Sequence, residues 1–197
     1  MDSQNEILDF WFGDQDEPGY PARDRHKLWF GKNVDTDRII SERFQIKLLN
    51  ATPSHPQEKD AHVCLALIVL FDQFPRNIYR DTPDAFDYDH HALTVSLQGV
   101  ESGIDQTLTA IERVFFYLPL EHSENLDVQE KSIAKFRELK ESVPIEKKDS
   151  FQSYLDYAVK HCDIVKRFGR FPHRNRILGR ISTPAEADFL QQPGSSF

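Results

Sequence analysis

Helix start and stop signals recur along the whole 197-residue chain, and no segment alternates apolar and polar residues as strands do. Thr82-Pro83 and Thr183-Pro184 each combine an N-cap residue with a proline at the first helical position. Glu186 completes a capping box with Thr183, and Gly169 stands where a left-handed residue ends a long helical pattern. Short links join the helical segments. We therefore predict an all-α protein of about seven to eight helices in stacked antiparallel pairs.

The boundaries of these helices follow from apolar periodicity between the signals. Pro75 is expected to end the most apolar helix at Phe74, and Pro119 to stop a helix that Asp105 caps. Ser123 and Ser150 are expected to cap the next two. The predicted helices cover residues 3–12, 35–50, 58–74, 83–99, 105–117, 123–142, 150–168 and 184–190. We expect one domain over residues 1–197, with 190–197 as a frayed tail.

Composition excludes several classes of protein. The longest apolar run, from Val63 to Phe71, is too short for a membrane span and fits a buried helix. The first residues lack the basic and apolar regions of a signal peptide, so we expect a cytoplasmic protein. Cys64 and Cys162 each lie in an apolar helical pattern and are expected to be buried, reduced thiols.

Charge is distributed unevenly. The net charge of −8 disfavours non-specific binding to nucleic acid or anionic membranes. Residues 160–180, however, hold seven lysines and arginines against one acid, Asp163. A basic segment in an acidic chain suggests an anionic partner at that place.

Two stretches of the sequence nearly repeat. "FPRNIYRDTP" covers residues 74–83, and "FPHRNRILGRISTP" covers residues 171–184. Each has Phe-Pro, then Arg-Asn, a further arginine and Thr-Pro, and the second copy inserts His173. We call them the first and second Phe-Pro turns. Both can serve as connectors between helices, and both can line one site.

The first Phe-Pro turn follows two polar residues, Asp72 and Gln73, at the end of an apolar run. A buried aspartate needs a partner, and arginine is the usual one. Arg76 and Asn77 can also simply satisfy the end of a helix. A structural role and a role in lining a site are both open for this stretch.

The segment "ERVFFYLPLEHSEN", residues 112–125, places Arg113 and Tyr117 on one helical face. His122 then precedes the next helix, whose N-terminal dipole would disfavour a charged imidazole. A neutral imidazole near pH 7 can act as a general base. The alternative is an ordinary surface histidine.

The segment from His161 to Arg180 is the richest in candidates. His161 shares a helical face with Ile164 and Phe168, where a lone histidine is more often a core residue than a ligand-binding one. Arginine forks bind carboxylates and phosphates through paired hydrogen bonds. The same arginines can also form a solvated surface, although phenylalanine, glycine and proline between them argue against it. The candidates here are Arg170, His173, Arg174, Asn175 and Arg180.

Standard catalytic and cofactor motifs are absent from the sequence. We find no G-x-G-x-x-G, G-x-x-x-x-G-K-[ST], H-E-x-x-H or G-x-S-x-G, and we expect no cofactor. His91 lies four residues after Asp87, but two ligands do not make a metal site. RNA binding by the alternating arginines and phenylalanines is disfavoured by the net charge.

Four motifs together resemble the DUF924 family of largely bacterial proteins of unknown function. They are "LDFWFG" at residues 8–13, "DQFPRNIYR" at 72–80, "ERVFFYLPLEHSE" at 112–124, and "FGRFPHRNRILGR" with "STPAE" at 168–186. They occur in order over nearly the whole chain. The resemblance implies an all-helical fold similar to tetratricopeptide-repeat (TPR) proteins. It implies no established activity and no catalytic residues.

Two hypotheses of function follow. In the first, helix ends gather into a pocket for a phosphate or carboxylate, with possible hydrolase or transferase chemistry; in the second, a TPR-like adaptor binds an acidic peptide or protein. A closed pocket formed by both Phe-Pro turns favours the first, and a long groove with the turns far apart favours the second. The candidate catalytic residues are Asp72, His122, Glu124 and His173. The candidate ligand-binding residues are Arg76, Asn77, Arg113, Tyr117, His161, Arg170, Arg174, Asn175 and Arg180.

Overall fold

The computed structural model describes residues 3–14, 19–20, 25–51 and 60–195. Within these ranges the regular elements are helices, packed in pairs, as predicted. The α-helices are α1 (Ser3–Phe12), α2 (His26–Phe30), α3 (Val34–Asn50), α4 (Ala61–Ile68), α5 (Phe74–Ile78), α6 (Asp89–Ser102), α7 (Ala110–Glu121), α8 (Leu126–Ser142), α9 (Lys148–Phe168) and α10 (Pro184–Leu190). A π-helical turn covers Val69–Gln73, and 3₁₀ turns cover Pro83–Phe86, Ile104–Thr107, Ile145–Lys147 and Pro172–Arg174.

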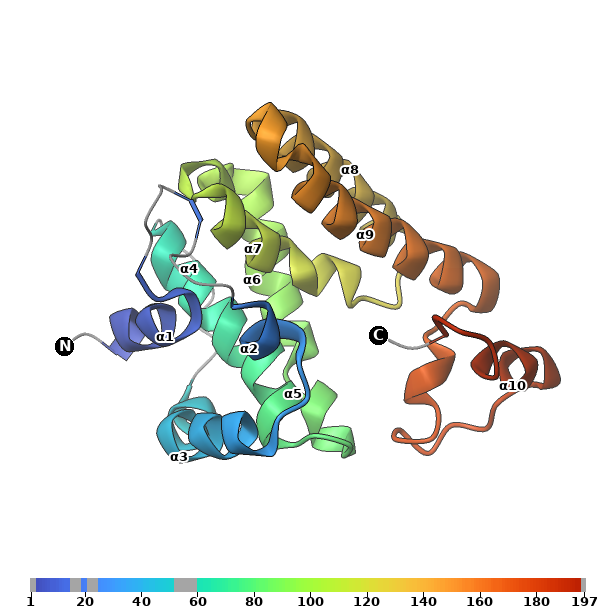
Figure 1. Ribbon diagram of the computed structural model, residues 1–197. Coiled ribbons are helices and arrows are strands. Elements are labelled where there is room, and N and C mark those ends of the chain that lie inside the picture. The colour runs from blue at the N-terminus through green and yellow to red at the C-terminus, as the bar shows by residue number, and fades with distance from the viewer. Residues whose placement is uncertain (1–2, 15–18, 21–24, 52–59, 196–197) are drawn as a thin grey trace.

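Helix α7 is the centre of the main core, and every residue from Ile111 to Glu121 is buried. It packs against α4, α6 and α8, while α1, α2 and α3 complete the N-terminal side (Figure 1). Aromatic rings fill the space between these helices. The ring of Phe74 lies 4.5 Å from Phe44 and 5.6 Å from Trp11, measured between centroids. The core thus fixes the start of the first Phe-Pro turn.

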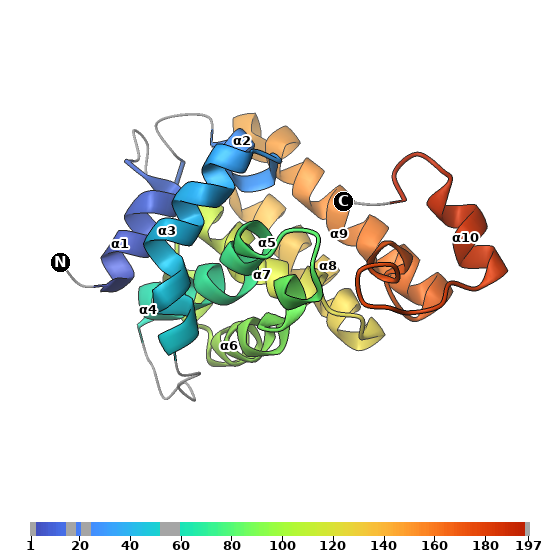
Figure 2. The ribbon, with the colours of Figure 1, turned by 90° about the horizontal axis from the view of Figure 1, so that it is seen from below.

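Helices α8 and α9 form a long antiparallel pair, and α10 lies beyond the far end of α9 (Figures 1 and 2). The second Phe-Pro turn connects α9 to α10. Ile164, Val165 and Phe171 form a small apolar cluster of their own, with Phe168 and Phe189 packed against it. We call residues 169–190 the C-terminal arm. Its apolar contacts are separate from the main core.

The helix before the first Phe-Pro turn does not end at Phe74 as predicted. Its backbone continues through the π turn into α5 and ends at Ile78. The amide of Phe74 donates to the carbonyl of Val69, five residues back. This wider turn makes room for Pro75, which lacks an N–H and would clash with a carbonyl in α-helical register. Pro75 therefore changes the register of the helix without ending it.

Helix α7 also differs from its prediction. It begins after Thr109, whose hydroxyl and backbone amide contact Glu112 in a capping box, and Pro119 lies inside it. Asp105 instead lies in a 3₁₀ turn and accepts a hydrogen bond from Tyr117. Tight burial on all sides of α7 outweighs the cost of one proline close to the helix end.

Other helix ends in the structure differ from the predicted ends by a few residues. Asn125, not Ser123, caps α8 by accepting from Val128, and α9 starts at Lys148, before Ser150. Helix α6 runs past Gly99 to the left-handed Gly103, and a side chain at position 99 would collide with the ring of Phe116. The restart at Pro83 is a 3₁₀ turn, and α6 begins only at Asp89.

Several sequence predictions are confirmed in the described residues. Gly169 has a φ of 71° at the end of α9, and Thr183 and Glu186 form the capping box that starts α10. Cys64 and Cys162 are buried and not joined in a disulfide. No helix in the described part of the chain has both the length and the hydropathy of a membrane span. The predicted helix start near 58 and most of the loops at 13–25 and 51–57 lie outside the described residues.

Candidate functional site

A buried aspartate and a histidine meet where the π turn packs against the end of α7. Asp72 belongs to the π turn and has no exposed surface, and His122 is the C-cap residue of α7. The Nδ1 of His122 lies 2.7 Å from Oδ1 of Asp72. Gln73 donates to the other carboxylate oxygen at 2.5 Å. Two residues 50 positions apart thus form a carboxylate–imidazole pair.

The electrostatics of this pair fix its protonation. Burial acts to raise the pKa of Asp72, but the charge of Arg76 and the hydrogen bond from His122 outweigh it and hold that pKa below its ordinary value. Burial lowers the pKa of His122, against the attraction of Asp72. The ring is therefore neutral near pH 7. The cause is burial and not the helix N-terminus expected from sequence, because His122 lies at a helix C-terminus.

The same arrangement determines the tautomer of His122. An ionised carboxylate only accepts hydrogen bonds, so the Nδ1 that faces Asp72 carries the proton. The Nε2 nitrogen keeps its lone pair. It has no hydrogen-bond partner among the residues that the structure describes, and the side chain is 17% exposed. This arrangement leaves Nε2 of His122 able to accept a proton.

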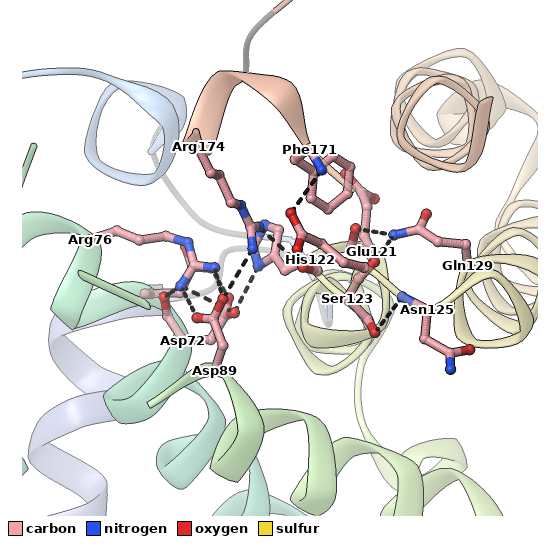
Figure 3. Close-up of polar contacts among 12 residues, drawn as sticks. Asp72, Arg76, Asp89, Glu121, His122, Ser123, Asn125, Gln129, Phe171 and Arg174 are labelled. Atoms are coloured by element: carbon pink, nitrogen blue, oxygen red, sulfur yellow. Dashed lines mark hydrogen bonds and ion pairs between the residues drawn. The ribbon is translucent and has the colours of Figure 1, made fainter. Parts of the chain in front are cut away.

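The two Phe-Pro turns meet at Asp89, the first residue of α6. Arg76, from the first turn, donates to both oxygens of Asp89, at 2.9 and 3.1 Å. Arg174, from the second turn, has its Nη1 3.5 Å from Oδ2 of Asp89 and donates from Nη2 to the carbonyl of His122 at 3.1 Å. Figure 3 shows both arginines directed at Asp89, with His122 beside Arg174. The near-repeated motifs therefore line one cluster.

Aromatic rings hold the guanidinium of Arg174 from two sides. Its central carbon lies 4.8 Å from the centroid of Phe86 and 4.7 Å from that of Phe171. The side chain is only 9% exposed. Burial, with the nearby charge of Arg76, lowers the pKa of Arg174 to about 10, so the group stays charged at neutral pH. Its Nε is buried with no hydrogen-bond partner in the described residues.

Glu124 holds the second Phe-Pro turn against the body of the molecule. Its carboxylate accepts from Arg180 at 2.7 and 3.0 Å and from the amide of Phe171 at 2.7 Å. Arg180 also donates to the carbonyl of Phe171. Glu124 and Asp72 were both candidate catalytic residues, and the carboxylate that contacts His122 is that of Asp72.

Two further histidines lie near this cluster. The Nδ1 of His161, on α9, lies 2.8 Å from the carbonyl of Tyr157 and 3.0 Å from the carboxylate of Glu121. His173 lies in the 3₁₀ turn, with its ring 5.6 Å from that of Phe171. Burial and the charge of Arg174 lower the pKa of His173 to about 4.

The remaining predicted ligand-binding residues contact other groups. Asn77 donates to Asp37 on α3, which also pairs with Arg80. Arg113 donates to Tyr117, whose hydroxyl donates to Asp105, away from the cluster around Asp72. In the C-terminal arm, Arg170 pairs with Glu186, and Asn175 donates to Ser182. These contacts stabilise the fold around the site.

Sequence reasoning missed Asp89, Phe86 and Glu121 as parts of this region. None of the three was chosen from the sequence as a candidate site residue. The signal that could have found Asp89 is its position just after the first Phe-Pro turn, at the start of a helix. No group of three or more potential metal ligands occurs among the described residues.

Comparison with known proteins places the chain in a family. The family model "Bacterial protein of unknown function (DUF924)" matches residues 7–194. A solved structure, titled "Structure of Protein of Unknown Function ATU0120 from Agrobacterium tumefaciens", is 33% identical and has a TM-score of 0.75. The match covers 95% of this chain and 96% of that one. No curated protein matches. The chain therefore belongs to the DUF924 family.

Proposed function

We propose that this protein binds an anionic small molecule, a phosphate or carboxylate, at the cluster of Arg76, Arg174 and His122, and that His122 acts there as a general base in a hydrolysis or transfer reaction. The observation that carries the proposal is the Asp72–His122 contact, flanked by an arginine from each Phe-Pro turn. The DUF924 family itself supplies no activity.

The chemistry required of His122 follows from its surroundings. Asp72 orients the ring through Nδ1 and stabilises the imidazolium that forms when Nε2 takes a proton. A lowered pKa leaves Nε2 unprotonated at neutral pH, as a base needs. A water or hydroxyl group bound at Nε2 is thereby activated as a nucleophile.

The anion is assigned to the arginines because their charges meet at one carboxylate. Asp89 joins Arg76 and Arg174 and is 22% exposed. An incoming phosphate or carboxylate offers the same kind of acceptor oxygens as Asp89 and can share or replace its contacts. The unused Nε of Arg174 is a further donor.

The adaptor hypothesis receives less support. A long groove with the two Phe-Pro turns far apart would favour it, whereas Asp89 and Phe86 each contact arginines from both turns. The TPR-like character that the resemblance implied remains part of that second proposal. We also propose a cytoplasmic location, because two buried thiols that form no disulfide fit a reducing compartment.

A thermal-shift titration tests the proposal, with inorganic phosphate, pyrophosphate and a dicarboxylate as probes. At about one hundred times the dissociation constant, a ligand adds about 2.7 kcal/mol of stability, or about 5–10 °C. The Arg174→Ala variant should lose this shift. Arg176→Ala is the matched control, because Arg176 lies on the same turn and is exposed. If Arg174→Ala melts earlier yet keeps the full ligand-induced shift, Arg174 is only structural.

A further inference from the structure

The carboxylate of Asp89 occupies the place where the proposed function puts an anion. Arg76 donates to both of its oxygens, at 2.9 and 3.1 Å, and the Nη1 of Arg174 lies 3.5 Å from Oδ2. Asp89 accepts no other side-chain hydrogen bond from the residues that the structure describes. Figure 3 shows its carboxylate at the ends of both arginine side chains. A group of the chain itself therefore fills the anion position.

Arg76 is held in its direction by groups other than Asp89. Its Nη1 donates to the backbone carbonyl of Asp72 and lies 3.4 Å from the carboxylate of the same residue. Asp72 is buried in the π turn and cannot follow a change at the surface. The guanidinium of Arg76 therefore keeps pointing at the anion position when Asp89 leaves it.

Arg174 also has anchors of its own. Its Nη2 donates to the carbonyl of His122 at 3.1 Å, and its guanidinium lies between the rings of Phe86 and Phe171. The side chain is 9% exposed, so few other directions are open to it. The two arginines thus form a pair of donors that does not depend on Asp89 for its geometry.

Asp89, by contrast, is free to turn away. It is the first residue of α6, and its side chain is 22% exposed. The start of the helix does not depend on its carboxylate, because the amides of His91 and Ala92 donate to the carbonyl of Tyr88. A change of side-chain rotamer is enough to move the carboxylate of an exposed aspartate into water.

The charges of the cluster favour replacement of Asp89 over sharing. Arg76 and Arg174 carry two positive charges, which the carboxylates of Asp72 and Asp89 cancel. An anion that enters while Asp89 is in place meets a like charge at contact distance and no net attraction. Once Asp89 has turned out, the same anion meets one net positive charge and two free sets of donors.

We propose that Asp89 is an internal competitor of the ligand, a carboxylate that occupies the anion site in the free protein and that the ligand displaces from Arg76 and Arg174. The inference rests on the proposed function and adds a means of regulation to it. Because this carboxylate is attached to the chain, its effective concentration at the site is high. It therefore lowers the affinity of the site for every external anion.

Titration with inorganic phosphate tests the proposal in the wild type and in Asp89→Asn. Asparagine keeps the size of the side chain and one acceptor oxygen but loses the charge. The variant should bind phosphate about tenfold more tightly or better, because the competing charge is gone. It should also melt earlier without phosphate and gain more from its addition than the wild type. Asp87→Asn is the matched control, since it makes the same charge change at an exposed position two residues away.

The outcomes separate this inference from the proposed function. If Asp89→Asn binds phosphate as the wild type does, or more weakly, or if Asp87→Asn gains as much, the inference is overturned and the proposed function stands. If neither the wild type nor Asp89→Asn binds phosphate, both fail. Carbon-13 NMR of the Asp89 carboxylate gives a second measurement on the unaltered protein. Saturating phosphate should move its signal towards that of a solvated aspartate, and an unmoved signal contradicts displacement.

Discussion

The two Phe-Pro turns carry nearly the same residues but are held in place by different forces. The first begins inside a continuous helix that ends at Ile78, with Phe74 packed among the rings of the main core. The second lies in a 3₁₀ turn of the C-terminal arm, with a small apolar cluster and ion pairs to Glu124 and Asp89. The first Phe-Pro turn is thus held mainly by apolar core packing, and the second mainly by polar contacts.

This difference bears on function. The π turn just before the first Phe-Pro turn holds Asp72, which is buried and contacts His122. The polar turn brings Arg174, which lies over the cluster and contacts a backbone carbonyl and Asp89. Under the proposed function, a ligand would share or replace the contact between Arg174 and Asp89, so the second turn is the wall that we expect to adjust to it.

The largest expected effect comes from truncating the two phenylalanines. Phe74→Ala should lower the free energy of unfolding by about 3–5 kcal/mol, because it leaves a cavity in the main core. Phe171→Ala should cost clearly less and act locally, by raising amide hydrogen exchange in α10. Urea unfolding and hydrogen exchange measure the two. Equal losses of global stability would contradict the contrast between the turns.

Replacing the carboxylate next to each Phe-Pro turn, Asp72 for the first and Glu124 for the second, should give the next largest effect on stability. Asp72→Asn should cost about 2–3 kcal/mol, since it removes a buried charge from Arg76 and His122. Glu124→Gln should cost about 1 kcal/mol, because that ion pair is partly exposed. The stability from Asp72 is present above its unfolded pKa of about 3.9 and is lost as the pH falls further. Denaturant midpoints of both variants, with Asp87→Asn as an exposed control, check the order.

The smallest expected effect is a pH dependence confined to the second turn. His173 has a folded pKa of about 4, below the value near 6.5 of the unfolded chain. The unfolded state binds more protons between these two values, so the arm loses stability as the pH falls from about 6.5 to 4. Hydrogen exchange in residues 171–190 should rise over that range. His173→Asn should reduce the dependence and leave the part that His122 contributes, whereas an unchanged profile assigns all of it to another group.

The sequence predicted the parts of this fold that depend on local signals. The capping box at Thr183, the left-handed Gly169 and the apolar helix before Asp72 were all readable, because each is set by neighbours in the chain. Pro119 inside α7 was not, because only packing from several other helices makes a proline tolerable there. The π turn was missed as well, since apolar periodicity does not reveal a single extra residue.

The residues of the candidate site were also only partly predictable from the sequence. Asp72, Arg76, His122 and Arg174 were chosen for their residue types and do lie together. Asn77 looked equivalent to Arg76, but it points to α3 and meets Asp37. Which side of a turn a residue faces depends on the register of the helix, and that register is set by the π turn.

The π turn also makes the site sensitive to chain length. Each residue of an α-helix turns the chain by about 100°, so the extra residue between Val69 and Gln73 sets the direction of everything that follows it. Deleting one residue there would return the helix to α register and swing Asp72 away from His122, even if every side chain were kept. Relatives that align across this segment without a gap preserve the direction of Asp72, and a one-residue gap there would mark a relative whose site is built differently.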